Sequence, residues 1–182
     1  MNNLNLKNTA ESLIETFLEA GKIAKEISER GVKVTIKSDK SPVTDGDLAV
    51  DIILREKIEN LTPSIPIISE ETVNLNIKNE YKNFWLIDPI DGTKDYIKKK
   101  DEYTLNAALI MDLKPVAGII YAPAKERLFF SYGKSLAYEV FKGKTLQLNC
   151  SKKNLGKVIG LENTNHTPIE ILNIYKKYNV SE

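Results

Sequence analysis

Two aspartates, Asp88 and Asp91, stand three positions apart after an apolar run and directly before the pair Gly92-Thr93. Carboxylate oxygens are the ligands that hard divalent cations prefer. The free N–H groups in the first turn of a helix can bind an anion. We therefore interpret this stretch as a strand that ends in a cation site beside an anion site, which suits a phosphate ester. A surface turn is the alternative, since Asp, Pro and Gly are common turn residues.

The elements around this motif decide between the two interpretations. The run Phe84–Ile87 is typical of a buried strand, and Pro89, which lacks an N–H, is expected to end it. Asp47 stands at a predicted helix start, and Glu70 directly follows the predicted strand Ile65–Ser69. Acids at the ends of several separate elements favour a cation site over a surface turn.

The sequence offers few residues that could support other kinds of catalytic site. His166 is the single histidine and lies among polar residues, which argues against a Ser-His-Asp arrangement. Clusters of Cys and His that could bind zinc are absent from the sequence, as is a P-loop. The basic run Lys98–Lys100 favours a solvated loop, with help to an anionic ligand as the alternative. It is the one feature that suggests nucleic-acid binding, and a net charge of +1 opposes that function.

The composition describes a globular chain. It has 182 residues, of which 42% are hydrophobic, and no apolar run long enough to span a bilayer. Cys150 is the single cysteine, so an intramolecular disulfide is impossible and a reducing compartment is expected. The N-terminal residues do not resemble a signal peptide. We expect a cytoplasmic protein.

The hydrophobic pattern predicts an α+β fold. Apolar residues at helical spacing predict one long amphipathic helix from Leu6 to Gly31, and Thr44 with Asp47 predicts a capping box that opens a second helix. These two helices are expected to lie on a mainly antiparallel sheet. Its later strands are predicted at residues 104–111, 116–121, 127–131, 137–141 and 145–148. We assign residues 1–150 to this domain and residues 151–182 to the beginning of a second α/β domain, with a strand at 157–160 and a helix at 169–178.

Three segments resemble the N-terminal signatures of the inositol monophosphatase superfamily of metal-dependent phosphatases. They are SPVTDGD at 41–47, SEE at 69–71 and WLIDPIDGTKDY at 85–96. Longer segments are similar to the 3'(2'),5'-bisphosphate nucleotidase (CysQ-type) branch. These are KSDKSPVT at 37–44, DGTKDYIKKKDEYTLNAALI at 91–110 and PVAGIIYAPAKERLFF at 115–130. The resemblance covers most of residues 8–150.

This resemblance implies a set of site residues. Two or three Mg²⁺ ions would be bound, and the substrate would contact several of the same groups. The metal ligands would be Glu70, Asp88, Asp91 and the Ile90 carbonyl; the substrate would meet Glu70, Ile90, Asp91, Gly92 and Thr93; and Asp47 with the Thr93 hydroxyl would position the attacking water. Lys37 would lie near the phosphate or an extra metal. Three alternatives stay open: Asp47 serves only as a helix cap, Lys37 is a surface lysine, and Glu71 is a solvated neighbour of the site.

The implied activity is magnesium-dependent hydrolysis of adenosine 3',5'-bisphosphate to AMP and phosphate, with inhibition by lithium. An inositol monophosphatase is the alternative within the family. The family's further signature, a Trp-Asp pair in a C-terminal domain, has no counterpart here, because Trp85 is the single tryptophan. We therefore expect a C-terminally truncated chain, and loss of one carboxylate ligand should weaken cation binding. A weakly active or inactive metal-binding remnant, which associates through the incomplete second domain, is the third possibility.

Overall fold

The computed structural model describes residues 4–72, 81–149, 158–159, 168–178 and 180–181. The chain forms two compact units, Met1–Leu148 and Asn149–Glu182. The single cysteine, Cys150, and the single histidine, His166, lie outside the described residues. The assignment of residues 1–150 and 151–182 to separate functional domains stays a prediction.

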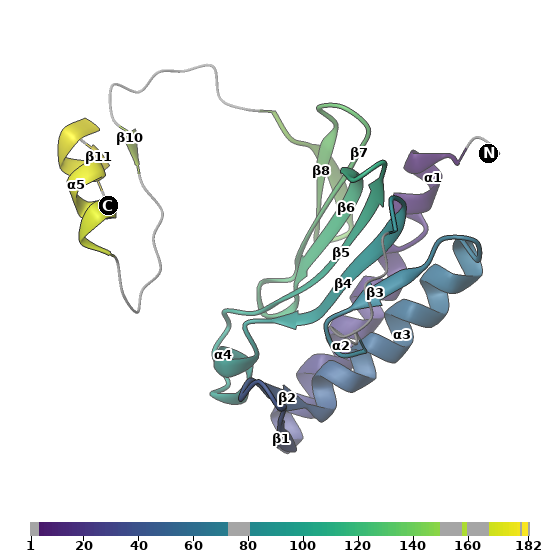
Figure 1. Ribbon diagram of the computed structural model, residues 1–182, viewed down its shortest axis with the longest axis horizontal. Helices are drawn as coiled ribbons and strands as arrows, with labels where there is room; N and C mark the ends of the chain where they lie inside the picture. Colours follow the sequence, from purple (N-terminus) through teal and green to yellow (C-terminus); the bar gives the residue numbers. More distant parts are fainter. Residues whose placement is uncertain (1–3, 73–80, 150–157, 160–167, 179, 182) are drawn as a thin grey trace. The chain divides into compact units, whose positions relative to one another are not determined.

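The first unit places three helices against one seven-stranded sheet (Figure 1). The helices are α1 (Leu6–Glu11), α2 (Ile14–Arg30) and α3 (Asp45–Leu61). The sheet has the order β3-β4-β5-β6-β7-β8-β9, with β3 parallel to β4 and every other neighbouring pair antiparallel. Its strands are β3 (Ile67–Ser69), β4 (Phe84–Asp91), β5 (Thr104–Met111), β6 (Lys114–Ala122), β7 (Arg127–Tyr132), β8 (Ala137–Phe141) and β9 (Lys144–Gln147). The predicted α+β fold, with helices on a mainly antiparallel sheet, is confirmed.

The hydrophobic core lies between the helices and one face of this sheet. Alternate residues of a strand point to opposite faces, and the buried set in β4 and β5 follows that rule. Trp85 and Ile87 face the core with Leu105 and Leu109, whereas Leu86 between them is 47% exposed. One face of the sheet therefore packs against the helices. The intervening residues of each strand, such as Leu86, point to the opposite face.

The predicted first helix is interrupted, which corrects the sequence-based interpretation. α1 ends at Glu11, and α2 begins at Ile14. Ala10, just before the break, and Leu13, within it, are both buried in the core. Because the apolar spacing continues across the break, the sequence pattern does not reveal it. The predicted end at Gly31 is confirmed: this residue caps α2 with a φ of 95°.

The expectation that β4 stops at Pro89 is wrong. The strand continues through Pro89 to Asp91. Asp88 pairs with Asn106 and Asp91 with Thr104, so two residues of β4 lie opposite one residue of β5. Such a β-bulge accommodates a proline because its missing N–H falls outside the regular ladder. The bulge also turns the end of β4 out of register immediately before the Gly92-Thr93 pair.

Short elements complete the surroundings of the motif. β1 (Val34–Ile36) and β2 (Pro42–Thr44) form a small antiparallel hairpin, and α4 (Thr93–Ile97) lies beside β2 (Figure 1). A 3₁₀ turn, η1 (Pro123–Lys125), links β6 to β7.

The second unit contains a helix and a short two-stranded sheet. The helix α5 (Ile169–Tyr178) lies where the sequence pattern predicted it. β10 (Val158–Ile159) pairs in parallel with β11 (Val180–Ser181), a strand that the sequence analysis did not predict. Throughout the described parts of both units, each helix is too short or too polar to cross a membrane.

Candidate active site

The site is built where two parallel strands end side by side. Ser69 of β3 pairs with Ile87 of β4, and the next N–H, that of Glu70, donates to the Ile87 carbonyl at 3.1 Å. Glu70 and Asp88 therefore follow paired positions on neighbouring strands. The two acids come together because β3 and β4 are parallel, which places their carboxyl ends at the same edge.

Among these acids, Asp88 has the most strongly shifted pKa. Its pKa is raised to about 7, chiefly because the carboxyl group is buried and also because of the negative charges of Glu70, Asp91 and Asp47. Its Oδ1 atom is buried and finds no hydrogen-bond partner within the described part of the chain. A buried carboxylate among like charges is stabilised by a proton or by a cation.

Asp47 uses its two carboxylate oxygens for different contacts. Oδ2 accepts hydrogen bonds from the Thr44 backbone N–H at 2.8 Å and from the Thr44 hydroxyl at 2.5 Å. This completes the predicted capping box at the start of α3. Oδ1 faces the hydroxyl of Thr93, with 3.4 Å between the oxygens. Burial raises the pKa of Asp47, although the bonds from Thr44 oppose that shift. Being a helix cap therefore does not exclude Asp47 from the site.

Gly92 and Thr93 form the start of α4. Gly92 has a φ of 92°, and a Cβ atom on it would lie 2.7 Å from the carbonyl oxygen of Glu102. Only glycine fits this backbone position without strain. The Thr93 hydroxyl also lies 3.0 Å from the Ile90 carbonyl, to which it can donate. The first N–H groups of a helix have no acceptor within the helix, so this turn can offer them to an anion.

Tyr96 joins the three helices that carry or support these groups. Its hydroxyl donates to the Ala24 carbonyl in α2 at 2.6 Å, and the side chain is fully buried. On α3, a Cβ added to Gly46 would lie 2.4 Å from that same hydroxyl, so the tyrosine sits directly against the α3 backbone. Gly46 precedes Asp47, and Tyr96 lies one turn after Thr93. The buried tyrosine thus fixes α4 relative to the first turn of α3.

The structure decides between the alternatives that the sequence leaves open for Lys37 and Glu71. Lys37 is not a surface lysine: its Nζ lies 2.9 Å from Glu71 and 3.3 Å from Glu70, and its side chain is 21% exposed. Glu71 is not solvated, because its side chain is only 4% exposed. Burial raises the pKa of Glu71, and Lys37 opposes that shift. No spacing rule could have found this pair, since the hairpin and the end of β3 are far apart in the sequence.

The donor groups fit a hard divalent cation, but they do not form a closed cage. Acidic side chains offer only oxygen atoms as ligands, and Asp88 offers a buried oxygen that has no hydrogen-bond partner among the described residues. Across the described ranges, no three Asp, Glu, His or Cys side chains converge closely enough to hold a metal ion between them. The Lys37 ammonium group lies 3.3 Å from Glu70 and 2.9 Å from Glu71, so both carboxylates already have a cationic partner. Asp91, the last residue of β4, is exposed.

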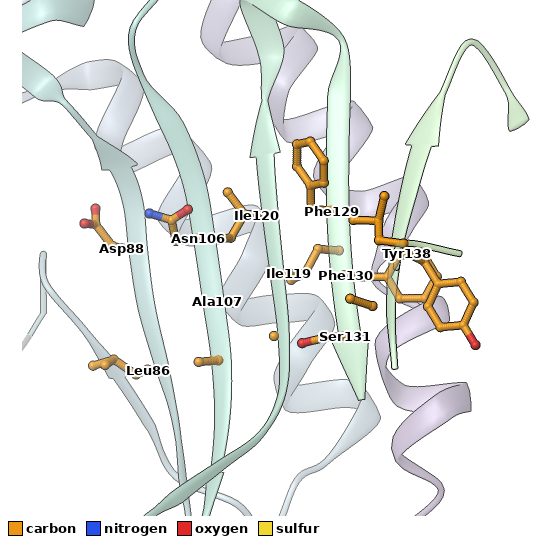
Figure 2. A pocket seen from close by; sticks show the side chains of 14 residues that line it. Leu86, Asp88, Asn106, Ala107, Ile119, Ile120, Phe129, Phe130, Ser131 and Tyr138 are labelled. Carbon is orange, nitrogen blue, oxygen red and sulfur yellow. The ribbon is translucent and has the colours of Figure 1, made fainter. Parts of the chain in front are cut away.

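Asp88 also stands at the border of an apolar groove on the sheet face that α1–α3 leave uncovered. Figure 2 shows Asp88 beside Asn106, with Ile120 and Phe129 farther along. The groove has a volume of about 410 Å³. Asn106 pairs with Asp88 across the strands, and its Oδ1 is likewise buried without a partner among the residues described. The polar end of the groove is thus formed by these two side chains.

Comparison with known proteins gives consistent matches. The model of the inositol monophosphatase family matches residues 5–181. The 3'(2'),5'-bisphosphate nucleotidase CysQ of Aggregatibacter actinomycetemcomitans is 35% identical over 140 residues, which are 76% of this chain and 52% of that relative. The enzyme of the same name from Salmonella typhimurium is 38% identical over 121 residues, which are 65% of this chain and 49% of that relative. The chain spans about half the length of these curated relatives.

Solved structures share the fold. The crystal structure of CysQ from Bacteroides thetaiotaomicron, described as a bacterial member of the inositol monophosphatase family, matches with a TM-score of 0.72 and 25% identity. The match covers 98% of this chain and 70% of that chain.

Proposed function

The chain belongs to the inositol monophosphatase family, and we propose that it carries the metal and phosphate site of a 3'(2'),5'-bisphosphate nucleotidase. The resemblance seen in the three signatures is confirmed by the family match and by the CysQ relatives. The proposed substrate is adenosine 3',5'-bisphosphate, and the products are AMP and phosphate. Support for this choice comes from the names of the curated relatives, whereas support for the chemistry comes from the site.

One observation carries the proposal: a buried, unpartnered Asp88 oxygen lies among other acids at the edge where the Gly92-Thr93 turn begins. Glu70, Asp88, Asp91 and the Ile90 carbonyl would hold Mg²⁺. When bound, Mg²⁺ supplies positive charge that offsets the negative charge of the phosphate and of the leaving oxygen.

The remaining roles belong to groups of the chain itself. The N–H groups of Gly92 and Thr93 orient the phosphate by donating hydrogen bonds to its oxygens. Asp47 Oδ1 and the Thr93 hydroxyl, which already face each other, orient the attacking water, and the Asp47 carboxylate accepts its proton. Asp47 suits this role because burial raises its pKa and so makes its carboxylate a better base. A cytoplasmic location is part of the same proposal, and its support is the single cysteine of the chain.

Phosphate release from adenosine 3',5'-bisphosphate in the presence of Mg²⁺ tests the proposal. Turnover should require Mg²⁺ and fall on addition of lithium, as the family membership leads us to expect. Asp91→Asn should abolish turnover with the fold retained, because it removes a metal ligand charge at nearly constant size. Asp112→Asn, which alters an exposed acid in the turn after β5, is the matched control. Full turnover by the Asp91 variant, or turnover of an inositol phosphate alone, would contradict the proposed site or the proposed substrate, respectively.

A further inference from the structure

Lys37 occupies a position among the site acids that the proposed reaction leaves unused. Its backbone is fixed in the turn between β1 and β2: the Lys37 N–H donates to the Ser41 carbonyl at 2.9 Å, and the Lys40 N–H donates to the Lys37 carbonyl at 3.0 Å. From this fixed turn the side chain reaches the end of β3. There its ammonium group contacts two consecutive glutamates, Glu70 and Glu71.

The two glutamates are unequal partners. Glu71 lies closer to Lys37 Nζ, at 2.9 Å, and its side chain is only 4% exposed. Glu70 lies at 3.3 Å, and its side chain is 51% exposed. A buried carboxylate that lost its cation would be strongly destabilising, whereas an exposed carboxylate can exchange partners at little cost. The contact with Glu71 is therefore the anchor, and the contact with Glu70 is the one that can be released.

We propose that Lys37 is a built-in counter-ion that competes with the divalent cation for Glu70, while Glu71 anchors it within reach. This inference rests on the proposed function, because it takes Glu70 to be a metal ligand. The positive charge of Lys37 lowers cation affinity in two ways. It holds one ligand in an ion pair, and it repels a second positive charge at short range. Cation binding then requires Glu70 to exchange the ammonium group of Lys37 for the divalent cation.

Calorimetric titration of the full chain with Mg²⁺ tests this competition. Lys37→Met keeps the length of the side chain and removes its charge. It should tighten Mg²⁺ binding about tenfold, because Glu70 is released and the repulsion is removed. The same variant should melt at a lower temperature without Mg²⁺, since Glu71 is then buried unpaired. Addition of Mg²⁺ should also raise the melting temperature of this variant more than it raises that of the unaltered chain.

Three further variants make the outcome decisive. Lys37→Arg keeps the charge and should bind Mg²⁺ as the unaltered chain does. Lys7→Met removes a lysine charge from an ion pair within α1 and should change nothing. Glu71→Gln removes the anchor and leaves Lys37 to Glu70 alone, so it should weaken Mg²⁺ binding. If Lys37→Met does not fold, this opposite shift still tests the competition.

The possible results separate the two proposals. Equal or weaker Mg²⁺ binding by Lys37→Met, or unchanged binding by Glu71→Gln, overturns the counter-ion role and leaves the proposed function standing. Absence of Mg²⁺ binding in the unaltered chain and in every variant overturns the proposed cation site itself.

Discussion

Thr93 Oγ1 lies 3.4 Å from Asp47 Oδ1, although the two residues are 46 positions apart in the sequence. The other oxygen of Asp47 accepts both bonds of the capping box at Thr44. A single carboxyl group therefore begins α3 with one oxygen and faces the start of α4 with the other. The structural role and the proposed catalytic role are carried by different atoms, so a substitution can separate them.

Asp47→Asn is expected to keep the fold and lose activity. The amide oxygen can still accept from Thr44, so the free energy of unfolding should change by less than about 1 kcal/mol. The amide nitrogen that replaces Oδ1 cannot accept a proton, so turnover should fall by about 100-fold or more. Urea denaturation and phosphate release measure the two effects.

Asp47→Ala provides the comparison, since it also removes the Asp47 half of the capping box, while Thr44 stays as the N-cap, and it should cost about 1 kcal/mol of stability. Full activity in Asp47→Asn would reduce Asp47 to a helix cap.

Asp88→Asn is expected to stabilise the chain without metal. It removes a buried charge that is repelled by Glu70, Asp91 and Asp47, and it keeps the shape of the side chain. The melting temperature without divalent cations should rise by ~2–4 °C, which corresponds to roughly 1 kcal/mol for a chain of this size. Mg²⁺ binding should be lost. The control is Asp112→Asn, at an exposed turn; an equal rise there would show that the effect is not specific to the site.

The stability of the metal-free chain is expected to fall as pH rises toward neutrality. The ordinary pKa of Asp88 is 3.8, and in the folded chain it is about 7, so the folded state binds this proton more tightly than the unfolded state does. The stabilisation is complete below the ordinary pKa and is lost as pH rises through the folded value. The raised pKa values of Asp47 and Glu71 act in the same direction.

Melting temperatures measured with a chelator between about pH 5 and pH 8 test this trend. The pKa values of Asp39 and Asp45 are lowered, so these groups stabilise the folded chain more as pH rises. Their effect is confined to more acidic solution. Asp88→Asn should flatten the profile. A melting temperature that rises steadily toward pH 8 would contradict the assignment of Asp88 as a repelled, buried acid.

Tyr96→Phe is expected to loosen the contact between α4 and α2. The ring and its edge-to-face contact with Tyr103 remain, but the hydroxyl bond to the Ala24 carbonyl is lost. The free energy of unfolding should fall by about 1–1.5 kcal/mol, as is usual for a buried hydrogen bond. Tyr81→Phe removes a hydroxyl from a residue that is 40% exposed and should have little effect. Equal losses in the two variants in urea denaturation would refute the special role of Tyr96.

Much of the fold was predictable because its signals are local. β5, β8 and α5 have the predicted bounds, and the capping box at Thr44 was read from two residues three positions apart. The break between α1 and α2 was not predictable, since apolar spacing persists across it. The continuation of β4 past Pro89 was missed because a proline predicts the end of a strand unless a bulge accommodates it.

The site was less predictable than the fold. The sequence predicted that acids from separate elements would gather, and the structure brings Glu70, Asp88 and Asp47 close enough to raise the pKa of Asp88. Burial and charge pairing, however, depend on the packing of distant segments. For that reason the sequence leaves open whether Lys37 is a surface lysine and whether Glu71 is solvated, and the structure shows them as a close ion pair with Glu71 only 4% exposed.

The bulge at Pro89 has a consequence for the evolution of this site. Pro89 and Ile90 interrupt the regular pairing of β4 with β5, and the displaced Ile90 carbonyl accepts the Thr93 hydroxyl. A substitution that restored regular pairing would make a better strand, yet it would withdraw this carbonyl and rotate Asp91 away from its present direction. Selection for a sturdier sheet and selection for chemistry therefore act against each other at one residue, so we expect stabilising substitutions of Pro89 to impair the site.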